Sequence, residues 1–232
     1  MTTLILTAIL GILVICAFFI FRVQSGKSES KGPPTILLLG PSGSGKTSLL
    51  LAWQDSQQQT LTSVEPNVLH EFKLLENVQV VDCPGNEKLQ KYANDYLKNG
   101  NIQAVIYMGD ASSGVANIKN AASTLGSVLE RTDSRGIPLL VATNKHDLFN
   151  TVSVQSIKRT LENEINELRD TRSRTVSKSG NDDINDDEGT EYLGVDGKPF
   201  QFEDLESEVQ VLDGSVKNNK LSKWETWVTS LE

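Results

Sequence analysis

A glycine-rich stretch is the part of this sequence that most directly indicates chemistry. Residues 40–47 read GPSGSGKT, which matches the pattern G-x-x-x-x-G-K-[ST], and they follow the apolar run TILLL at 35–39. In such a loop the backbone N–H groups face phosphate oxygens, Lys46 reaches the β- and γ-phosphates, and the Thr47 hydroxyl binds Mg²⁺. The stretch predicts a nucleoside triphosphate site, and the alternative is a chance Gly-rich turn. The predicted phosphate-binding residues are Gly40, Pro41, Ser42, Gly43, Ser44, Gly45, Lys46, Thr47 and Ser48.

A D-x-x-G motif, DCPG at 82–85, stands at the end of the apolar run VQVVD. A carboxylate at Asp82 can hold Mg²⁺ through water, and the N–H of Gly85 can sense a γ-phosphate. The motif is common and weak by itself. It gains weight because it follows the phosphate loop and lies at the end of a predicted strand.

The next motif, NKHD at 144–147, points to the base. The carboxylate of Asp147 can accept two hydrogen bonds from the N1–H and 2-amino group of guanine, whereas adenine would leave it unpaired. Asn144, Lys145 and Asp147 therefore predict GTP rather than ATP as the ligand. Ser215, Val216 and Lys217 are similar to a loop that packs on guanine, and they extend the predicted base site.

A hydroxyl ligand that reaches Mg²⁺ only when the γ-phosphate is present must come from TLTSVEPN at 60–67. Thr62 and Ser63 compete for this role, and the sequence does not decide between them. With Thr62 in that role, the predicted metal ligands are Thr47, Thr62 and Asp82.

Features of fast hydrolysis are missing from the sequence. Asn86 occupies the position after D-x-x-G where a glutamine commonly orients the attacking water, so it is only a weak catalytic candidate. No arginine lies between Thr47 and Asp82. We therefore expect slow intrinsic turnover, and a switch or assembly module rather than a fast enzyme.

Charge and cysteine content exclude other classes. The chain has 232 residues, with 22 Lys and Arg against 30 Asp and Glu, and a formal net charge of -8. This sign argues against nucleic acid as the main ligand. Cys16 and Cys83 are the only cysteines, so neither a disulfide framework nor a Cys-based zinc site can form.

The N-terminus carries an uncharged apolar run, LILTAILGILVICAFFIF at 4–21. As a helix it would span about 27 Å, enough for a thin bilayer. Arg22, Lys27 and Lys31 follow the run, which favours an uncleaved anchor with the rest of the chain in the cytosol. We predict a transmembrane anchor at 1–22 and a flexible tether at 23–34. A cleavable signal peptide and a buried core helix are the alternatives.

The remaining elements must position these motifs. Short apolar runs at 35–39, 68–75, 78–82, 104–108, 138–143 and 208–212 alternate with longer helical stretches. This alternation predicts an α/β domain over 35–232, with a doubly wound, mainly parallel six-stranded sheet and helices on both faces. The segment 173–198 interrupts the pattern and predicts a mobile acidic insertion, with an acidic docking segment as the alternative. The spacing of Leu221, Trp224, Trp227, Val228 and Leu231 predicts a final helix that packs on the core.

Taken together, these features resemble the beta subunits of the signal recognition particle receptor, membrane-anchored relatives of the Arf GTPases. The residues that carry the resemblance are the anchor, GPSGSGKTSLL, the T-x-T-S stretch at 60–63, DCPG with a following non-Gln residue, TNKHDL, SVK and the closing W-x-x-W-V. Two features depart from the pattern: Asn86 stands where the family commonly has His, and the acidic insertion has no assigned role.

The resemblance implies a P-loop GTPase fold that binds GTP or GDP with Mg²⁺. It also implies a single-pass protein of the endoplasmic reticulum membrane whose GTPase domain is cytosolic and binds the receptor's alpha subunit in the GTP form. The complex would help deliver ribosomes with nascent chains to the translocon, so the ribosome or translocon are further possible partners. The alternatives are an Arf-like trafficking GTPase and a scaffold that holds GTP permanently.

Overall fold

The structure of the protein is a computed structural model that describes residues 32–55, 63, 65–86, 90–178 and 193–231. The predicted anchor and nearly all of the predicted tether lie outside these residues. Within the described part of the chain, none of the helices combines the length and the apolar character needed to cross a membrane. The folded unit begins at Pro33.

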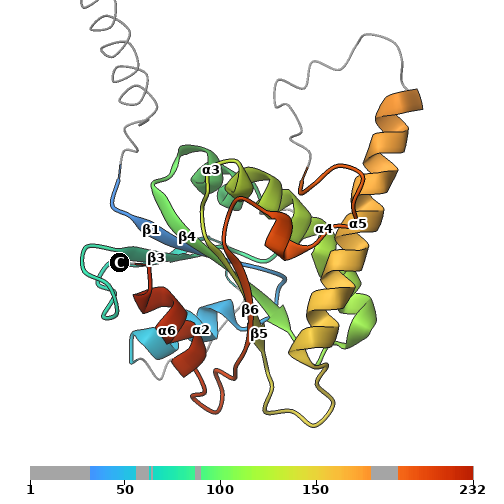
Figure 1. The fold of residues 1–232 in the computed structure, drawn as a ribbon. Coiled ribbons are helices and arrows are strands. Elements are labelled where there is room, and N and C mark those ends of the chain that lie inside the picture. Colours follow the sequence, from blue (N-terminus) through green and yellow to red (C-terminus); the bar gives the residue numbers. More distant parts are fainter. Residues whose placement is uncertain (1–31, 56–62, 64, 87–89, 179–192, 232) are drawn as a thin grey trace, which may run out of the picture. The chain divides into compact units, whose positions relative to one another are not determined.

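A six-stranded sheet in the order β2-β3-β1-β4-β5-β6 forms the centre of the described chain (Figure 1). Its strands, in chain order, are β1 (Thr35–Leu39), β2 (Asn67–Leu69), β3 (Gln79–Asp82), β4 (Ile102–Asp110), β5 (Leu139–Asn144) and β6 (Val209–Asp213). All neighbouring strands pair in parallel except β2, which is antiparallel to β3. The predicted mainly parallel, six-stranded α/β sheet is confirmed.

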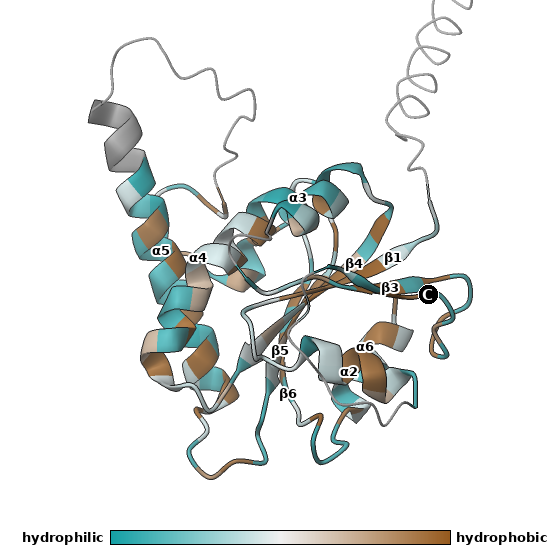
Figure 2. Ribbon diagram, turned by 180° about the vertical axis from the view of Figure 1, so that it is seen from behind, coloured by the Kyte–Doolittle hydropathy of each residue, from teal (hydrophilic) through white to brown (hydrophobic). Residues whose placement is uncertain are grey.

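Helices cover both faces of the sheet (Figure 1). One face carries α2 (Lys46–Trp53) and α6 (Ser222–Thr229), and the other carries α3 (Gln90–Asn99), α4 (Gly114–Asp133) and α5 (Val154–Lys178). A short 3-10 helix, η2 (Phe202–Asp204), precedes β6. Figure 2 shows hydrophobic residues concentrated along the strands and on the helix sides that face them. The doubly wound arrangement therefore follows from strands that are apolar on both faces.

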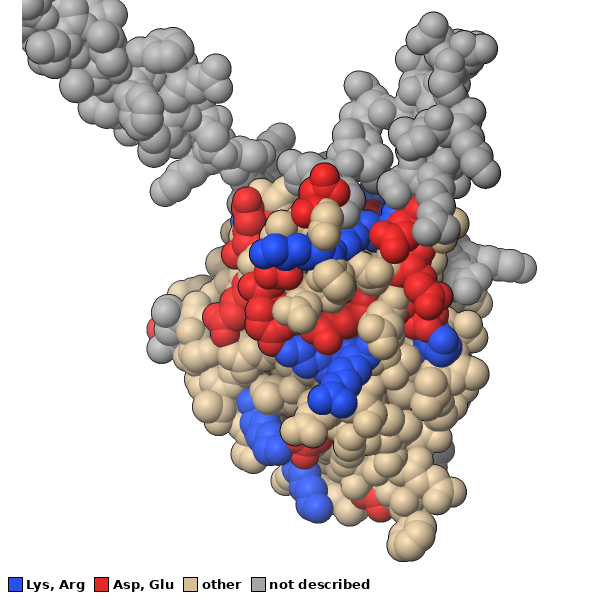
Figure 3. Space-filling model, turned by 45° about the vertical axis from the view of Figure 1, so that its right-hand side comes forward, with Lys and Arg blue, Asp and Glu red and all other residues tan. Residues whose placement is uncertain are grey.

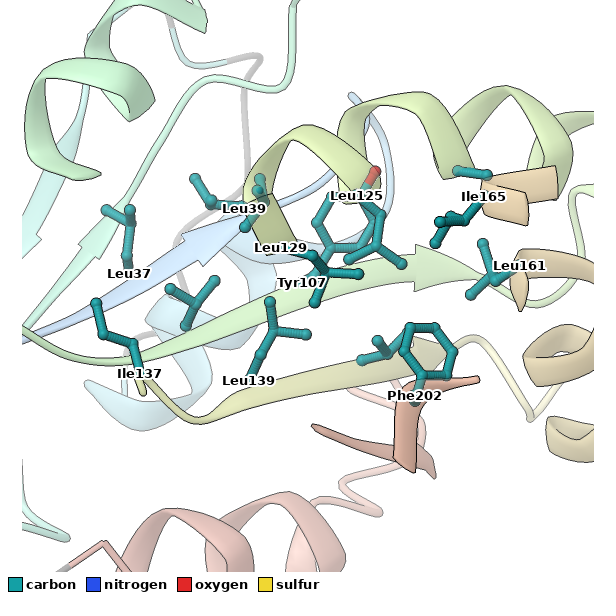
Figure 4. Packing of buried hydrophobic residues seen from close by; sticks show 14 of the residues in the cluster. Leu37, Leu39, Tyr107, Leu125, Leu129, Ile137, Leu139, Leu161, Ile165 and Phe202 are labelled. Carbon is teal, nitrogen blue, oxygen red and sulfur yellow. The ribbon is translucent and has the colours of Figure 1, made fainter. Parts of the chain in front are cut away.

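The core on the α4 and α5 side contains large aliphatic and aromatic side chains (Figure 4). Tyr107 on β4 is buried there, and its hydroxyl donates a hydrogen bond to the backbone oxygen of Ala121 on α4 at 3.0 Å. This bond satisfies the polar end of a buried aromatic side chain and ties α4 to the centre of the sheet.

The second predicted strand, 68–75, is wrong in length. Only Asn67–Leu69 forms a strand, and the following residues make turns. Phe72 and Leu75 in this turn region are buried, and the ring of Phe72 lies 5.0 Å from that of Trp53 between centroids. These apolar residues pack with α2 over the sheet instead of extending the strand. The apolar pattern alone does not distinguish a strand from a turn region whose side chains are buried.

The segment 173–198, which the sequence predicts to be a mobile acidic insertion, is described in the structure only at its two ends. Helix α5 continues to Lys178, and Leu193 is buried. The guanidinium of Arg169 on α5 donates to the backbone oxygens of Leu193 at 3.2 Å and of Lys198. The returning chain is therefore fixed to α5, while residues 179–192 lie outside the described part.

The outer surface of α5 is charged but mixed in sign. Lys119 on α4 pairs with Glu164 on α5, and Arg172 on α5 pairs with Glu130 on α4. Figure 3 shows basic and acidic side chains next to one another on this side of the molecule. Exposed pairs of this kind contribute little stability each, about 0 to 1 kcal/mol, so the two helices are held mainly by their apolar contacts.

The final helix packs as the sequence predicts, with Trp224, Trp227 and Val228 buried. Its Trp224 ring leaves no space beside Gly214, the residue that precedes the S-V-K loop. A Cβ added at Gly214 would lie 2.4 Å from Cζ2 of Trp224. The bulk of a buried tryptophan therefore requires glycine at this position.

We expect Gly214→Ala to lower the free energy of unfolding by about 2 to 3 kcal/mol, because the rigid ring must move within a packed core. Urea unfolding followed by tryptophan fluorescence measures the change. Gly109→Ala is the matched control, because a Cβ at Gly109 meets no atom within 4 Å. Equal stability of the two variants would contradict the packing argument.

Candidate functional site

The loop between β1 and α2 is wrapped tightly enough to exclude side chains at two glycines. Gly40 has a φ of 127°, and a Cβ there would lie 2.2 Å from the backbone oxygen of Met108. Gly45 has a φ of 106°, and a Cβ there would lie 2.2 Å from Nδ2 of Asn144. Both the left-handed backbone and the close neighbours require glycine. The sequence pattern of the loop is therefore also a geometric requirement of this structure.

Lys46, the first residue of α2, is folded back over the loop. Its Nζ donates to the backbone oxygens of Gly40 at 2.9 Å and of Pro41 at 3.0 Å. Burial lowers the pKa of the Lys46 ammonium, and the nearby Asp82 carboxylate opposes that shift. A buried cation held only by carbonyl oxygens and one nearby carboxylate is a suitable partner for an anionic phosphate.

Thr47 and Asp82 meet at the start of α2 and the end of β3. The Thr47 hydroxyl donates to Oδ2 of Asp82 at 2.6 Å. Oδ1 of Asp82 is buried, and no hydrogen-bond partner for it occurs among the described residues. Burial raises the pKa of the Asp82 carboxyl, and the hydrogen bonds from Thr47 and Asn67 oppose this rise.

These groups fit a magnesium ion. Hydroxyl and carboxylate oxygens are ligands that Mg²⁺ prefers, and the unpartnered Oδ1 would gain a cationic neighbour. No cluster of three or more His, Cys, Asp or Glu side chains able to hold a metal occurs in the described part of the chain. A Mg²⁺ ion here would therefore keep water and phosphate oxygens among its ligands, as this metal usually does.

Ser63 lies beside these two residues. Its Oγ is 3.4 Å from Oγ1 of Thr47 and accepts a hydrogen bond from Nδ2 of Asn67 at 2.9 Å. The competing candidate, Thr62, lies outside the described residues, so its role stays a prediction. Asn67, for which the sequence motifs predict no role, also donates to Oδ2 of Asp82 at 3.2 Å. The pairing of β2 with β3 sets Asn67 opposite Asp82.

The D-x-x-G loop packs directly on the phosphate loop. A Cβ added at Gly85 would lie 2.5 Å from the backbone nitrogen of Ser42. Asn86 follows in a bend and is exposed. The two loops thus form adjoining walls of a cavity of about 190 Å³, whose lining includes Lys46, Thr47 and Asp82.

The base motif is connected to the phosphate loop through one side chain. Nδ2 of Asn144 donates to the backbone oxygen of Ser44 at 2.8 Å, and Oδ1 of Asn144 accepts from the backbone N–H of Val216 at 3.1 Å. The Ser215 hydroxyl donates to Oδ1 of Asp147 at 2.6 Å, and this bond lowers the pKa of Asp147. The structure therefore brings together the S-V-K loop, the N-K-x-D motif and the phosphate loop.

Asp110, at the end of β4, is a further candidate residue that the sequence motifs did not identify. Nζ of Lys145 donates to Oδ2 of Asp110 at 2.6 Å, and the N–H and hydroxyl of Ser112 donate to Oδ1 at 2.9 and 2.6 Å. Burial alone would raise the pKa of Asp110, but these hydrogen bonds outweigh it and the net shift is downward. Its position at the end of an apolar strand, like that of Asp82, was the available signal.

The fold and site define a small GTPase: a mainly parallel sheet with a phosphate loop after β1, D-x-x-G at the end of β3 and N-K-x-D at the end of β5. A family model described as signal recognition particle receptor beta subunit matches residues 31–209. The chain belongs to this family.

Individual relatives agree with this assignment. The signal recognition particle receptor subunit beta of Saccharomyces cerevisiae is 32% identical over 215 residues, which cover 88% of this chain and 87% of that protein. Two solved structures are similar over nearly the whole fold. The mammalian SRP receptor has a TM-score of 0.71 and 29% identity, with coverage of 85% of this chain and 100% of that chain. The signal recognition particle receptor SRb-GDP from Chaetomium thermophilum has a TM-score of 0.69 and 26% identity, with coverage of 88% and 100%.

Proposed function

We propose that this protein is the GTP-binding switch subunit of a signal recognition particle receptor. In its GTP form it binds the receptor's alpha subunit and supports co-translational protein targeting to the endoplasmic reticulum. Family membership supports this role. The observation that carries it is Asn144, whose side chain joins the phosphate loop to the S-V-K loop and so assembles one guanine nucleotide site.

The nucleotide binds along the carboxyl edge of the sheet. Residues 40–48 and Gly85 surround the phosphates, and Asn144, Lys145, Asp147 and residues 215–217 surround the guanine. The relative from C. thermophilum, described with GDP, supports this ligand. Mg²⁺ would be held by the Thr47 hydroxyl and the Asp82 carboxylate, with the Ser63 hydroxyl as the favoured third ligand because it lies 3.4 Å from Oγ1 of Thr47, and with Thr62 as the alternative. The ion neutralises charge on the phosphate oxygens when bound.

A single N-terminal helix at 1–22 anchors the protein in the endoplasmic reticulum membrane, and the tether at 23–34 connects it to the cytosolic GTPase domain. The uncharged run at 4–21 and the basic residues after it support this topology. Contact with the ribosome or the translocon would follow from the receptor's role. The first alternative is an Arf-like trafficking GTPase that binds membranes reversibly. This alternative would be rejected if the full chain stays in membranes during carbonate extraction.

The decisive experiment measures how the nucleotide state changes partner affinity. The full chain in detergent is loaded with GDP or with a non-hydrolysable GTP analogue and titrated with the N-terminal domain of the alpha subunit. We expect at least about tenfold tighter binding to the GTP form, since a ligand shifts an equilibrium only through differential affinity. Equal affinities would reject the switch and favour the scaffold that holds GTP permanently.

Slow hydrolysis stays a prediction that a second measurement checks. Nucleotide released from the freshly purified full chain is identified by chromatography. Recovered GTP is expected if Asn86 does not position water efficiently. GDP alone would mean that turnover occurs without a partner.

Asp110 is expected to act on the nucleotide through Lys145. We predict that Asp110→Asn speeds release of a fluorescent GDP analogue about three- to tenfold, because the half-exposed ion pair fixes the Lys145 side chain only modestly. In a Lys145→Met background the same change should have no further effect, since the partner is gone. Asp213→Asn, which removes the exposed pair with Lys223, is the matched control and should leave release unchanged. Additive effects of Asp110→Asn and Lys145→Met would contradict this role.

A further inference from the structure

A second and larger cavity lies beside the phosphate site, between α3 and α4. Its volume is about 440 Å³, compared with about 190 Å³ for the cavity around Lys46 and Thr47. This size lies within the range of small-molecule sites in proteins. Small side chains leave the space open: Ala93 faces it from α3, and Ala121 and Thr124 face it from α4.

The buried part of the cavity lining is apolar, and the exposed part contains several asparagines. Leu97, Tyr107 and Ile118 line it and are buried, so they form an apolar floor. Asn94, Asn117 and Asn120 also line it and are exposed, so the exposed part of the lining includes three carboxamides.

The charge of the lining limits the ligand. Asp110 is the charged side chain in the described lining, and it is already paired with Lys145 and bonded to Ser112. Among the described lining residues a charged ligand would therefore find no free counter-charge to replace its water. A neutral molecule with a ring-sized apolar body and an amide-like edge matches both the apolar floor and the exposed carboxamides.

The cavity shares a wall with the phosphate site. Ser42, Pro84 and Gly85 line both cavities. The distance of 2.5 Å from a Cβ at Gly85 to the nitrogen of Ser42 shows that no free space separates the two loops. A molecule that presses on this wall from the α3 and α4 side must therefore affect the backbone that faces the phosphates.

We propose that the cavity between α3 and α4 binds a small neutral molecule with an apolar ring and a carboxamide-like edge, and that its occupancy is coupled to the nucleotide through the wall of Ser42, Pro84 and Gly85. The coupling rests on the proposed function. The binding site itself does not.

The site is tested with indole-3-carboxamide as the probe, titrated against the full chain in detergent and followed by saturation-transfer NMR. For a fragment of this size we expect a dissociation constant on the order of 1 mM. Ala121→Leu fills the cavity from α4 and Ala93→Leu fills it from α3, and each should weaken binding at least about tenfold. Ser123→Leu, an exposed position on α4 outside the lining, is the matched control and should bind like the wild type.

Two results would overturn the site: no saturation of the wild-type protein up to about 10 mM probe, or unchanged binding in both filled variants when circular dichroism shows them folded. If only one of the two filled variants is folded, unchanged probe binding by that variant is sufficient to overturn the assignment of the cavity as a binding site.

The coupling is tested by the same titration of protein loaded with GDP and with a non-hydrolysable GTP analogue. We expect the affinity for the probe to differ at least about threefold between the GDP-loaded and the GTP-analogue-loaded protein. Because coupling is reciprocal, a saturating concentration of the probe must change the ratio of the two nucleotide affinities by the same factor. Equal affinities would overturn the coupling. If the chain binds no guanine nucleotide, the proposed function fails, whereas titration of the nucleotide-free protein still decides whether the cavity is a site.

Discussion

Asp147→Asn is expected to change the base preference of the protein from guanine to xanthine nucleotides. In the proposed site the carboxylate at this position accepts hydrogen bonds from two donors of the guanine base, and an amide would present one donor and one acceptor instead. Xanthine carries a carbonyl where guanine has its 2-amino group, so it pairs with the amide. We expect GDP affinity to fall at least about 100-fold and xanthosine diphosphate affinity to rise above it.

Competition of GDP and xanthosine diphosphate against a fluorescent nucleotide measures both changes in one protein. The Ser215 hydroxyl can still donate to the side-chain oxygen of an asparagine, so the loop keeps the bond that it makes at 2.6 Å to Asp147. Asp213→Asn, at the end of β6, controls for the loss of one negative charge near the site. A variant that still prefers GDP would remove the main reason for assigning a guanine ligand.

Asp82→Asn is expected to have opposite effects on stability and on nucleotide retention. Without metal, the wild-type protein buries a carboxylate whose Oδ1 has no partner in the described structure, and removing that charge should stabilise the fold. The gain is limited because an asparagine leaves an unpaired amide in the same place. We expect about 1 kcal/mol, which corresponds to an unfolding temperature about 2 to 4 °C higher.

Nucleotide retention in the same variant should become independent of Mg²⁺. The wild-type protein in excess EDTA is the matched reference, and its GDP release should be at least about tenfold faster than with Mg²⁺. Asp82→Asn should release GDP at that faster rate with or without the metal. If the variant is less stable than the wild type and Mg²⁺ still slows its GDP release, Asp82 stabilises the fold and does not bind the ion.

The strands could be predicted because a sheet covered on both faces leaves continuous apolar runs in the sequence. Five runs coincide with strands to within about two residues, which is the usual uncertainty of element ends. The run at 68–75 failed because Phe72 and Leu75 are apolar for a different reason. They cover the sheet beneath α2 from within turns, and an apolar pattern does not record whether the backbone around it is extended.

The candidate site could be predicted where its geometry is local. The phosphate loop, D-x-x-G and N-K-x-D each place their side chains within one turn after one strand, so their spacing in the sequence is sufficient. Asn67 and Asp110 were missed because their contacts cross between strands. Asn67 reaches Asp82 through the register of an antiparallel pair, and Asp110 reaches Lys145 because β4 and β5 end side by side.

The two hydrogen bonds of Asn144 also determine how a bound nucleotide can leave. One side chain fixes Ser44, which precedes the last glycine of the phosphate loop, and Val216, which lies in the loop beside the base. A partner that displaces residues 215–217 therefore removes an anchor from the phosphate loop without touching it. For a nucleotide bound as we propose, opening at the base and loosening at the phosphates are a single event, so an exchange factor needs access to only one end of the ligand.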